Sequence, residues 1–400
     1  IPFSPPRIDE ESIAEVVDTL RSGWITTGPK TKLFEKKLEE YCEVRRVLCL
    51  NSATAAMEMA LRWYGIGPGD EVIIPAYTYC ATANVVVHVG AKPVMVDCDE
   101  DFNISLDQIK SHISSKTKAI VPVDIGGYPC DYDEIYAILK DPEIKSLFQA
   151  KNEKEEKLGR IMLLADAAHS IGAEYKGKKS GALADASAFS FHAVKNLTTA
   201  EGGALCLNLP EEFDTDQIYR ELNTLSLHGQ SKDAFSKMQV GAWKYDVSRA
   251  GYKCNMTDIN ASLGLVELGR YQENLEKRKE IFSIYNSLFS DRDQFLLPPI
   301  KSAEKETSYH LYLLRVRGVS EDQRNAIIQE IAEENIAVNV HFIPLPLLSQ
   351  YKRLGYDIVN YPKAYANYAC EISLPVYFNL SSESALRVGR SVIAAVKKVL

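Results

Sequence analysis

The chain has 400 residues, 46% of them hydrophobic, which is enough for a large domain with its own core and a second, smaller domain. Its net charge of −8 is spread over both halves without a basic block, which argues against nucleic acid and membranes as partners and favours small molecules. The longest apolar stretches, at 71–76 and 161–165, are strand length and far short of the roughly 20 residues of a bilayer-spanning helix.

From residue 46 to about 209, short β-branched runs alternate with longer helical patterns, which is typical of a mostly parallel sheet covered by helices. The predicted strands are 46–50, 71–75, 93–97, 119–123, 161–166, 187–191 and 203–209. The predicted helices are 53–64, 81–89, 106–113 and 132–139. Residues 151–160 are nearly all charged or polar, which predicts an exposed loop or helix end without a catalytic role.

The pattern changes at residue 258. Residues 258–289 form one long amphipathic stretch, which predicts a single helix that links two domains. The pattern that follows predicts a strand, a helix, a strand and a final helix at 310–316, 321–334, 337–342 and 383–399. We therefore expect an α/β large domain at 1–257, followed at 258–400 by the interdomain helix and a small α+β domain.

Cysteine and histidine spacing bears on redox state and metal binding. The eight cysteines contain no C-x-x-C pair and most have apolar neighbours, so we expect a reduced, cytoplasmic protein. No signal peptide is recognised at the start of the sequence. The seven histidines show no metal-ligand spacing, and we expect no metal site.

The strongest chemical signal surrounds Lys195, which follows a predicted strand. Small and hydroxylated residues crowd this lysine, and Gly202 and Gly203 follow it. A lysine that attacks an aldehyde must be neutral part of the time, and burial with nearby positive groups lowers its pKa accordingly. A single loop lysine is more often an exposed surface residue, so the catalytic interpretation depends on its companions.

The first companion, Asp166, ends a very apolar strand. Ligands of open α/β sheets bind at the carboxyl ends of strands. A carboxylate there suits the ring nitrogen of pyridoxal phosphate (PLP), which it keeps protonated so that the ring acts as an electron sink. The alternative is a helix N-cap, because Asp followed by two alanines also suits that position.

Two further segments offer contacts for the same cofactor. Ser52, Ala53 and Thr54 lead from a strand into a helix, whose N-terminus offers free N–H groups and a positive dipole to a phosphate. Helix capping alone would also select serine and threonine there. Tyr77 and Tyr79 follow another strand, and either could lay its ring on the pyridine face or belong to the core.

Together these motifs resemble the DegT/StrS type of nucleotide-sugar aminotransferase, within the fold type I PLP-dependent transferases. The resemblance covers nearly the whole chain. It is carried by the segments 23–29, 51–56, 67–75, 166–169, 190–195, 251–258, 341–344 and 374–375. It implies a large PLP-binding domain with a mixed, mostly parallel sheet covered by helices, a smaller C-terminal α+β domain, and a homodimer in which the partner chain completes each site.

The resemblance also implies roles for single residues. Lys195 corresponds to the catalytic lysine that holds PLP as a Schiff base, and Asp166 to the catalytic partner of the pyridinium nitrogen. His169 would stand near the phenolic oxygen of PLP. Tyr79 matches the stacking aromatic of the family better than Tyr77.

The phosphate and substrate contacts are implied in the same way. The phosphate would be held by Ser52, Ala53, Thr54 and Ser190. The motif at 251–256 departs from the commoner Gly-Tyr-Asn-x-Arg-Met, because Lys253 replaces the phosphate-binding Asn and Asn255 replaces the Arg; a lysine still suits a phosphate. Pro346 stands where many relatives have a histidine facing the substrate. The residues expected near the substrate are Thr26, Thr27 and His341.

The implied reaction is ping-pong amino transfer. Glutamate gives its amino group to PLP, which leaves pyridoxamine phosphate as the intermediate. A 3- or 4-keto-6-deoxy sugar nucleotide then accepts the amine, for polysaccharide or glycan biosynthesis. Lys195 would serve as anchor and as general base.

Three alternatives remain. A cyclitol aminotransferase would share every motif quoted above. A PLP-dependent sugar dehydratase has the same scaffold, but those relatives carry histidine at the position of Lys195. A PLP-binding regulatory protein without turnover is a non-enzymatic alternative, against which the intact lysine, aspartate and phosphate site argue.

Overall fold

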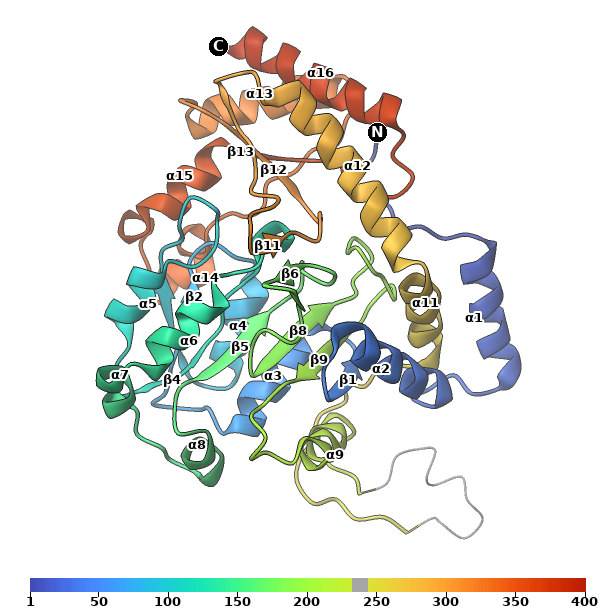
Figure 1. Cartoon of the computed structure of the whole chain (residues 1–400), viewed down its shortest axis with the longest axis vertical. Helices are drawn as coiled ribbons and strands as arrows, with labels where there is room; N and C mark the ends of the chain where they lie inside the picture. The colour runs from blue at the N-terminus through green and yellow to red at the C-terminus, as the bar shows by residue number, and fades with distance from the viewer. Residues whose placement is uncertain (232–243) are drawn as a thin grey trace.

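The structure is a computed structural model that describes residues 1–231 and 244–400. Its large domain is built on a seven-stranded sheet in the order β1-β9-β8-β5-β4-β2-β3 (Figure 1). Strand β9 runs antiparallel to β8 and β1, and the other pairings are parallel. The predicted mixed, mostly parallel sheet is therefore confirmed. Its strands are β1 (Arg46–Leu50), β2 (Glu71–Pro75), β3 (Lys92–Val96), β4 (Thr117–Ile120), β5 (Met162–Asp166), β8 (Ala186–Ser190) and β9 (Gly203–Leu207).

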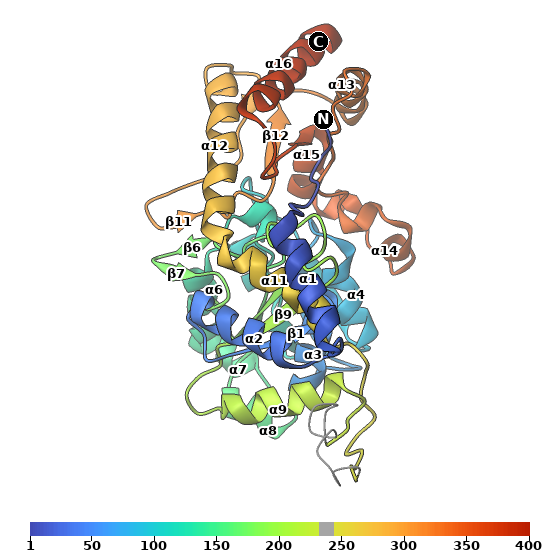
Figure 2. The ribbon, with the colours of Figure 1, turned by 90° about the vertical axis from the view of Figure 1, so that its right-hand side faces the viewer.

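Helices cover both faces of this sheet because alternate strand residues point to opposite sides. Leu48 and Leu50 belong to the core beneath α3, whereas Val47 and Cys49 belong to the core beneath α2. Figure 2 shows α1 lying beside α11 at the edge of the domain. The helices that precede residue 231 are α1 (Glu10–Ser22), α2 (Pro29–Cys42), α3 (Ala53–Tyr64), α4 (Cys80–His88), α5 (Leu106–His112), η1 (Ile125–Gly127), α6 (Tyr132–Lys140), α7 (Pro142–Leu147), α8 (Glu153–Leu158) and α9 (Thr215–Ser226).

The smaller domain is α+β, as predicted. Its antiparallel sheet has the order β10-β12-β13, and the apolar faces of α12, α13 and α16 pack on it (Figure 1). The strands are β10 (Phe295–Leu296), β12 (Tyr312–Val316) and β13 (Glu371–Leu374), and the helices are α13 (Glu321–Glu333), η2 (Leu345–Leu347), α14 (Ser349–Arg353), η3 (Ile358–Asn360), α15 (Pro362–Cys370) and α16 (Ser382–Val399). A third sheet joins the two parts of the chain, with β11 (Lys305–Glu306) paired to the hairpin of β6 (Glu174–Tyr175) and β7 (Lys178–Lys179). The division at residue 257 stays a prediction.

The single interdomain helix predicted at 258–289 is wrong, because the structure has two helices there. These are α11 (Asp258–Gly269) and α12 (Tyr271–Phe289), separated at Arg270, whose φ of −115° and ψ of 16° are not helical. The guanidinium of Arg270 binds the carboxylates of Asp9 and Glu267, both at 2.5 Å. The contact of Arg270 with the distant residue Asp9 therefore stabilises the break between the two helices. The apolar pattern runs on across this break and gave no sign of it.

The strand predicted at 337–342 is also wrong. Only Asn339 pairs there, in an isolated bridge to Ser373 of β13. The backbone N–H of His341 is bound instead by the side-chain carboxyl of Glu371, at 3.0 Å. The Glu371 side chain therefore occupies the N–H group of His341 that would otherwise have extended the strand pairing with β13.

The charged segment 151–160 forms a short helix, α8, capped by Asn152. The prediction of an exposed segment is wrong for Glu155, which is fully buried and pairs with the equally buried Lys118 at 3.0 Å. Glu155 also accepts hydrogen bonds from the backbone of Lys151 and from the side chain of Asn152. Both partners are charged, and charged residues are usually exposed, so the composition of the segment gave no indication of this buried pair.

Replacing Glu155 with alanine is expected to lower the free energy of unfolding by roughly 3–5 kcal/mol, because it leaves the ammonium of Lys118 buried without its counter-charge. Urea denaturation measures the change. The matched control is Glu156→Ala, an exposed position in the same helix, which should change stability by less than about 0.5 kcal/mol. Equal losses in the two variants would contradict the buried pair.

Within 1–231 and 244–400, no helix is both long and apolar enough to cross a bilayer. All eight cysteines are free.

Candidate active site

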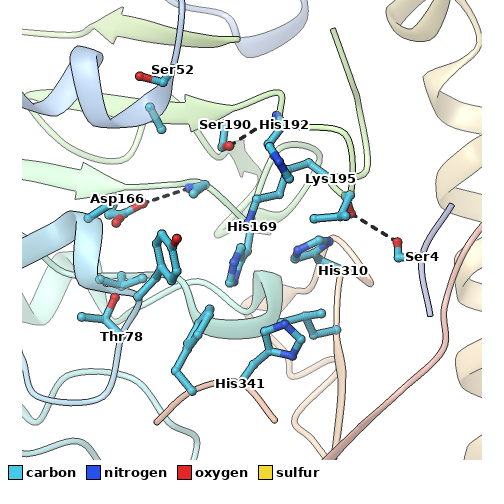
Figure 3. Close-up of a pocket in the computed structure, with 18 of the residues that line it drawn as sticks. Ser4, Ser52, Thr78, Asp166, His169, Ser190, His192, Lys195, His310 and His341 are labelled. Carbon is cyan, nitrogen blue, oxygen red and sulfur yellow. Dashed lines mark hydrogen bonds between the residues drawn. The ribbon is translucent and has the colours of Figure 1, made fainter. Parts of the chain in front are cut away.

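A cavity of about 500 Å³ lies at the carboxyl ends of the parallel strands, beside the small domain (Figure 3). Such an edge is where α/β sheets bind their ligands. Nine of the predicted site residues line it, namely Ser52, Ala53, Thr54, Tyr79, Asp166, His169, Ser190, Lys195 and His341. Among the described residues, no cluster of three or more metal-ligating side chains is present.

Lys195 reaches the cavity from the loop after β8 and is not a free surface lysine. The loop is fixed at Asn196, whose side chain donates to the carbonyl of Ser308 at 2.8 Å and whose carbonyl accepts from Asn274 at 2.5 Å. Burial lowers the pKa of Lys195 to about 8, although the charge of Asp166 opposes this shift. A sizeable fraction of the amine is therefore neutral near pH 7 to 8, as a nucleophilic lysine requires.

Both oxygens of the Asp166 carboxyl are hydrogen-bonded at the end of β5. The hydroxyl of Thr82 donates to Oδ2 at 2.8 Å and the N–H of Ala168 donates to Oδ1 at 3.2 Å. Burial raises the pKa of Asp166, while these two bonds and the charge of Lys195 oppose the rise. The residues after Asp166 form a turn, so the alternative of a helix N-cap is excluded, although Asp166 does cap this turn.

The N-terminus of α3 forms a cradle that fits a phosphate. Ser52 caps the helix by accepting from the N–H of Ala55 at 3.1 Å. The N–H groups of Ala53 and Thr54 have no carbonyl within the helix to bind, so they can donate to an anion. Gly203 starts β9 so close to this turn that a Cβ there would lie 2.3 Å from the nitrogen of Ala53. Glycine at this position therefore keeps the cradle intact.

The structure distinguishes between Tyr77 and Tyr79, the two candidates for the residue that stacks on the cofactor ring. Tyr77 is fully buried, and its hydroxyl donates to the carbonyl of His341 at 2.6 Å. Tyr79 is 60% exposed and lines the cavity, with its ring centroid 5.9 Å from that of Phe342. Only Tyr79 can therefore reach a ring bound in the cavity.

His169 is a buried, neutral imidazole on the cavity wall. Burial, with a smaller effect from the charge of Lys195, holds its pKa well below the usual range. Its Nδ1 accepts from the N–H of Gly126 at 3.3 Å, so Nε2 carries the proton and can donate to an oxygen. Its ring stacks on Phe342, with centroids 5.6 Å apart.

Four predicted residues do not line the cavity of this chain. Asn255 donates to the hydroxyl of Thr27 at 2.6 Å and accepts from the ammonium of Lys253 at 2.5 Å, and the carbonyl of Thr26 binds the N–H of Asp258. Lys253 is exposed. These residues form a separate cluster beside the end of β1, where Asn255 bridges to Leu50, and only Lys253 among them is exposed.

Several cavity residues carried no signal in the sequence. His310 lies just before β12 with its ring centroid 4.5 Å from that of His169, and its Nδ1 is 2.8 Å from the amide oxygen of Asn196. Phe3 stacks on His341 at 5.5 Å, and Ser4 donates to the carbonyl of Val194 at 3.3 Å. They come from the small domain and the N-terminal segment, which meet Lys195 only in the folded chain (Figure 3).

A lysine with a lowered pKa, a buried carboxylate and an anion cradle beside them are what fold type I PLP enzymes offer their cofactor. The sequence comparison agrees, since the chain belongs to the DegT/DnrJ/EryC1/StrS aminotransferase family, whose sequence profile matches residues 6–393. It is therefore a PLP-dependent aminotransferase of the sugar aminotransferase family.

Individual relatives match over at least 97% of their length. The PMP form of the putative sugar aminotransferase Spr1654 from Streptococcus pneumoniae superposes with a TM-score of 0.97 and 50% identity, covering 100% of both chains. The uncharacterised protein MJ1066 of Methanocaldococcus jannaschii is 40% identical, over 100% of this chain and 97% of its own. The spore coat polysaccharide biosynthesis protein SpsC of Bacillus subtilis is 37% identical with the same coverage.

Proposed function

We propose that the protein moves an amino group from glutamate to a 3- or 4-keto-6-deoxy sugar nucleotide for polysaccharide or glycan biosynthesis, with Lys195 as the Schiff-base lysine. The observation that carries this proposal is the convergence of Lys195 and Asp166 on one cavity at the strand ends. The similarity to Spr1654 and SpsC supports a sugar as the amino acceptor.

The cavity residues divide into those that hold the cofactor and those that position it. The phosphate would be held by the N-terminus of α3 and by Ser190, and the ring would lie between Tyr79 and the opposite wall. Asp166 would face the ring nitrogen, and Nε2–H of His169 would donate to the phenolic oxygen. The chemistry that PLP supplies when bound is an electron sink for the charge that develops on the substrate carbon.

Lys195 moves the proton in this proposal. Its Nζ would take the proton from the carbon of glutamate and deliver it to the cofactor carbon, and in the second half-reaction it would move a proton the opposite way, onto the sugar carbon. This requires an amine that is neutral at the working pH. The lowered pKa of about 8 meets this requirement. Asp166 favours the protonated state of the neighbouring ring, because its buried carboxylate is stabilised by a positive charge beside it.

We further propose a cytoplasmic homodimer with shared sites. Lys253 and Asn255 lie outside the cavity of their own chain, and Lys253 is exposed, so its ammonium is available to a partner subunit. An ammonium at that place suits a phosphate. The eight free cysteines fit a reduced compartment.

The test is transfer of labelled nitrogen from glutamate to a panel of keto-sugar nucleotides, followed by mass spectrometry. We expect glutamate alone to shift the visible absorbance band of the cofactor, and a 3- or 4-keto-6-deoxy hexose nucleotide to receive the label. Transfer to a keto-cyclitol and to no sugar nucleotide would establish the cyclitol alternative. A band that glutamate leaves unchanged would establish a binding protein without turnover.

A further inference from the structure

Glu371 is a fully buried carboxyl that the proposed reaction does not use. It lies on β13, behind the cavity wall formed by His341. Its Oε2 accepts from the backbone N–H of His341 at 3.0 Å, and its Oε1 accepts from the hydroxyl of Ser373 at 2.5 Å. Both oxygens act as acceptors, which is the arrangement of an ionised carboxylate.

Ser373 connects this carboxyl to the imidazole of His341. The oxygen of Ser373 lies 2.8 Å from Nδ1 of His341. Because the single hydroxyl proton of Ser373 points to Glu371, Nδ1 must be the donor in this contact. The other ring nitrogen, Nε2, then carries a lone pair and makes no hydrogen bond to the part of the chain that the structure describes.

The imidazole of His341 faces the cavity and is neutral. Burial, with a smaller effect from the charge of Lys195, lowers its pKa to about 3. Figure 3 shows its ring on the cavity wall near His310 and His169. A neutral imidazole offers one donor and one acceptor. The position of its proton therefore decides whether Nε2 presents a donor or an acceptor to the cavity.

The hydrogen bonds that link His341, Ser373 and Glu371 can also run in the opposite direction. When Nε2 takes up one proton from the cavity, Nδ1 passes its proton to Ser373, and Ser373 passes its own to Oε1 of Glu371. The imidazole stays neutral, Glu371 becomes a neutral acid, and Nε2 becomes a donor. One proton enters the chain and one carboxylate is neutralised, so the exchange balances.

We propose that Glu371, acting through Ser373, is a positioning residue that decides whether His341 accepts or donates a hydrogen bond to the sugar substrate. The donor form suits the keto oxygen of the sugar, which can only accept a hydrogen bond, and the acceptor form does not. The choice of the keto oxygen rests on the proposed function, whereas the order of the protons within the relay of Glu371, Ser373 and His341 does not.

The charge state of Glu371 makes the relay depend on pH. Burial raises the pKa of Glu371 to about 8, opposed by its bonds to Ser373 and His341. The other groups that face Glu371 are Arg324, Arg315, Tyr77 and Cys370; the two guanidinium charges also oppose the rise. Lys195, His169 and His310 face His341. The acceptor form of His341 should therefore predominate above this pKa and the donor form below it.

The direct test is nitrogen NMR of the holoenzyme with ring-labelled histidine, recorded across pH values on both sides of the pKa of Glu371. The ring nitrogen shifts distinguish protonated from unprotonated nitrogen, and a His341→Asn variant assigns the signals. We expect the proton to move from Nε2 to Nδ1 as the pH rises. A proton that stays on one nitrogen throughout would overturn the proposal.

Two variants separate the relay from a structural role. In Glu371→Gln, the amide oxygen must face the N–H of His341, so its NH₂ group donates to Ser373 and fixes the proton on Nε2 at every pH. Ser373→Ala should abolish the pH dependence, and Ser373→Thr should restore it. Ser187→Ala is the matched control, because Ser187 is another buried strand serine and its hydroxyl has no partner in the described structure; it should behave as the parent protein.

Kinetics provide a second readout. Above the pKa of Glu371, the Glu371→Gln protein keeps the donor form that the parent protein loses. Its KM for the sugar nucleotide should therefore be roughly tenfold lower than that of the parent, the usual effect of one hydrogen bond, and its half-reaction with glutamate should be unchanged. A folded Glu371→Gln protein that still titrates like the parent, or that slows both half-reactions equally, would overturn the proposal. If no sugar nucleotide is turned over, the NMR result still decides on the relay.

Discussion

Replacing Lys195 with alanine is expected to remove the visible absorbance band of the covalently bound cofactor and to slow amino transfer by at least about 10³-fold. The band disappears because no amine remains to bond the cofactor aldehyde. The rate falls because the same Nζ is the proposed general base, a role that contributes a factor of roughly 10² to 10⁴. Absorbance spectra and steady-state transfer from glutamate measure the two effects.

Lys92→Ala is the control for this variant, since Lys92 is an exposed lysine that pairs with Glu71 at the start of β3. It should leave both the band and the rate unchanged. If Lys195→Ala kept the band, another lysine would hold the cofactor, and the assignment of Lys195 would be wrong.

Asp166→Asn is expected to retain bound cofactor but to slow amino transfer by roughly 10²- to 10³-fold, as expected for the loss of one preorganised group that stabilises developing charge. Asparagine is neutral, so it removes the carboxylate that would keep the ring nitrogen protonated. It keeps an oxygen that can accept from Thr82 and Ala168. The measurements are cofactor content, unfolding by urea and the rate of transfer.

This substitution also separates the two roles of Asp166. Asparagine caps turns as well as aspartate does, so a purely turn-capping Asp166 would tolerate the change in both stability and rate. Thr82→Ser, which keeps the hydroxyl that binds Oδ2, is the matched control and should change the rate by less than the asparagine variant. Normal turnover in Asp166→Asn would refute its role beside the cofactor.

The sequence predicts the bounds of helices and strands best where capping and turn residues mark both ends of an element. Both bounds of α3 are predicted correctly, because Ser52 caps its start and Gly65, at a φ of 96°, ends it. The strands β1 and β2 also have their predicted bounds, because each is an apolar run that stops at turn residues. The motifs around Asp166 and Lys195 belong to this class, since Asp166 is the last residue of β5 and Lys195 lies in the loop after β8.

The errors arise where distant contacts override a local pattern. The break at Arg270 depends on Asp9, and the loss of the strand at 337–342 depends on Glu371, neither of which is near in sequence. Glu155 is buried because Lys118 on a neighbouring strand neutralises it. A single sequence contains no signal for such pairings.

The same limit applies to the site. Residues in continuous motifs that end strands of the large sheet were found, whereas His310 and Phe3 were not, because they approach Lys195 only through tertiary structure. Lys253 and Asn255 show the opposite case, since their motif is recognisable but their side chains lie outside the cavity of their own chain.

The N-terminal segment limits how the two domains can move. The carbonyl of Ile1 binds the N–H of Ala337 in the small domain, and Ser4 binds the carbonyl of Val194 in the large one. Only three Cα–Cα steps, about 11 Å in all, join these anchors. The helix α12 and the pairing of β11 with β6 also join the two domains, so a movement between them would have to bend or break several connections. Widening of the cavity at the edge beside Phe3 requires that one anchor be released first.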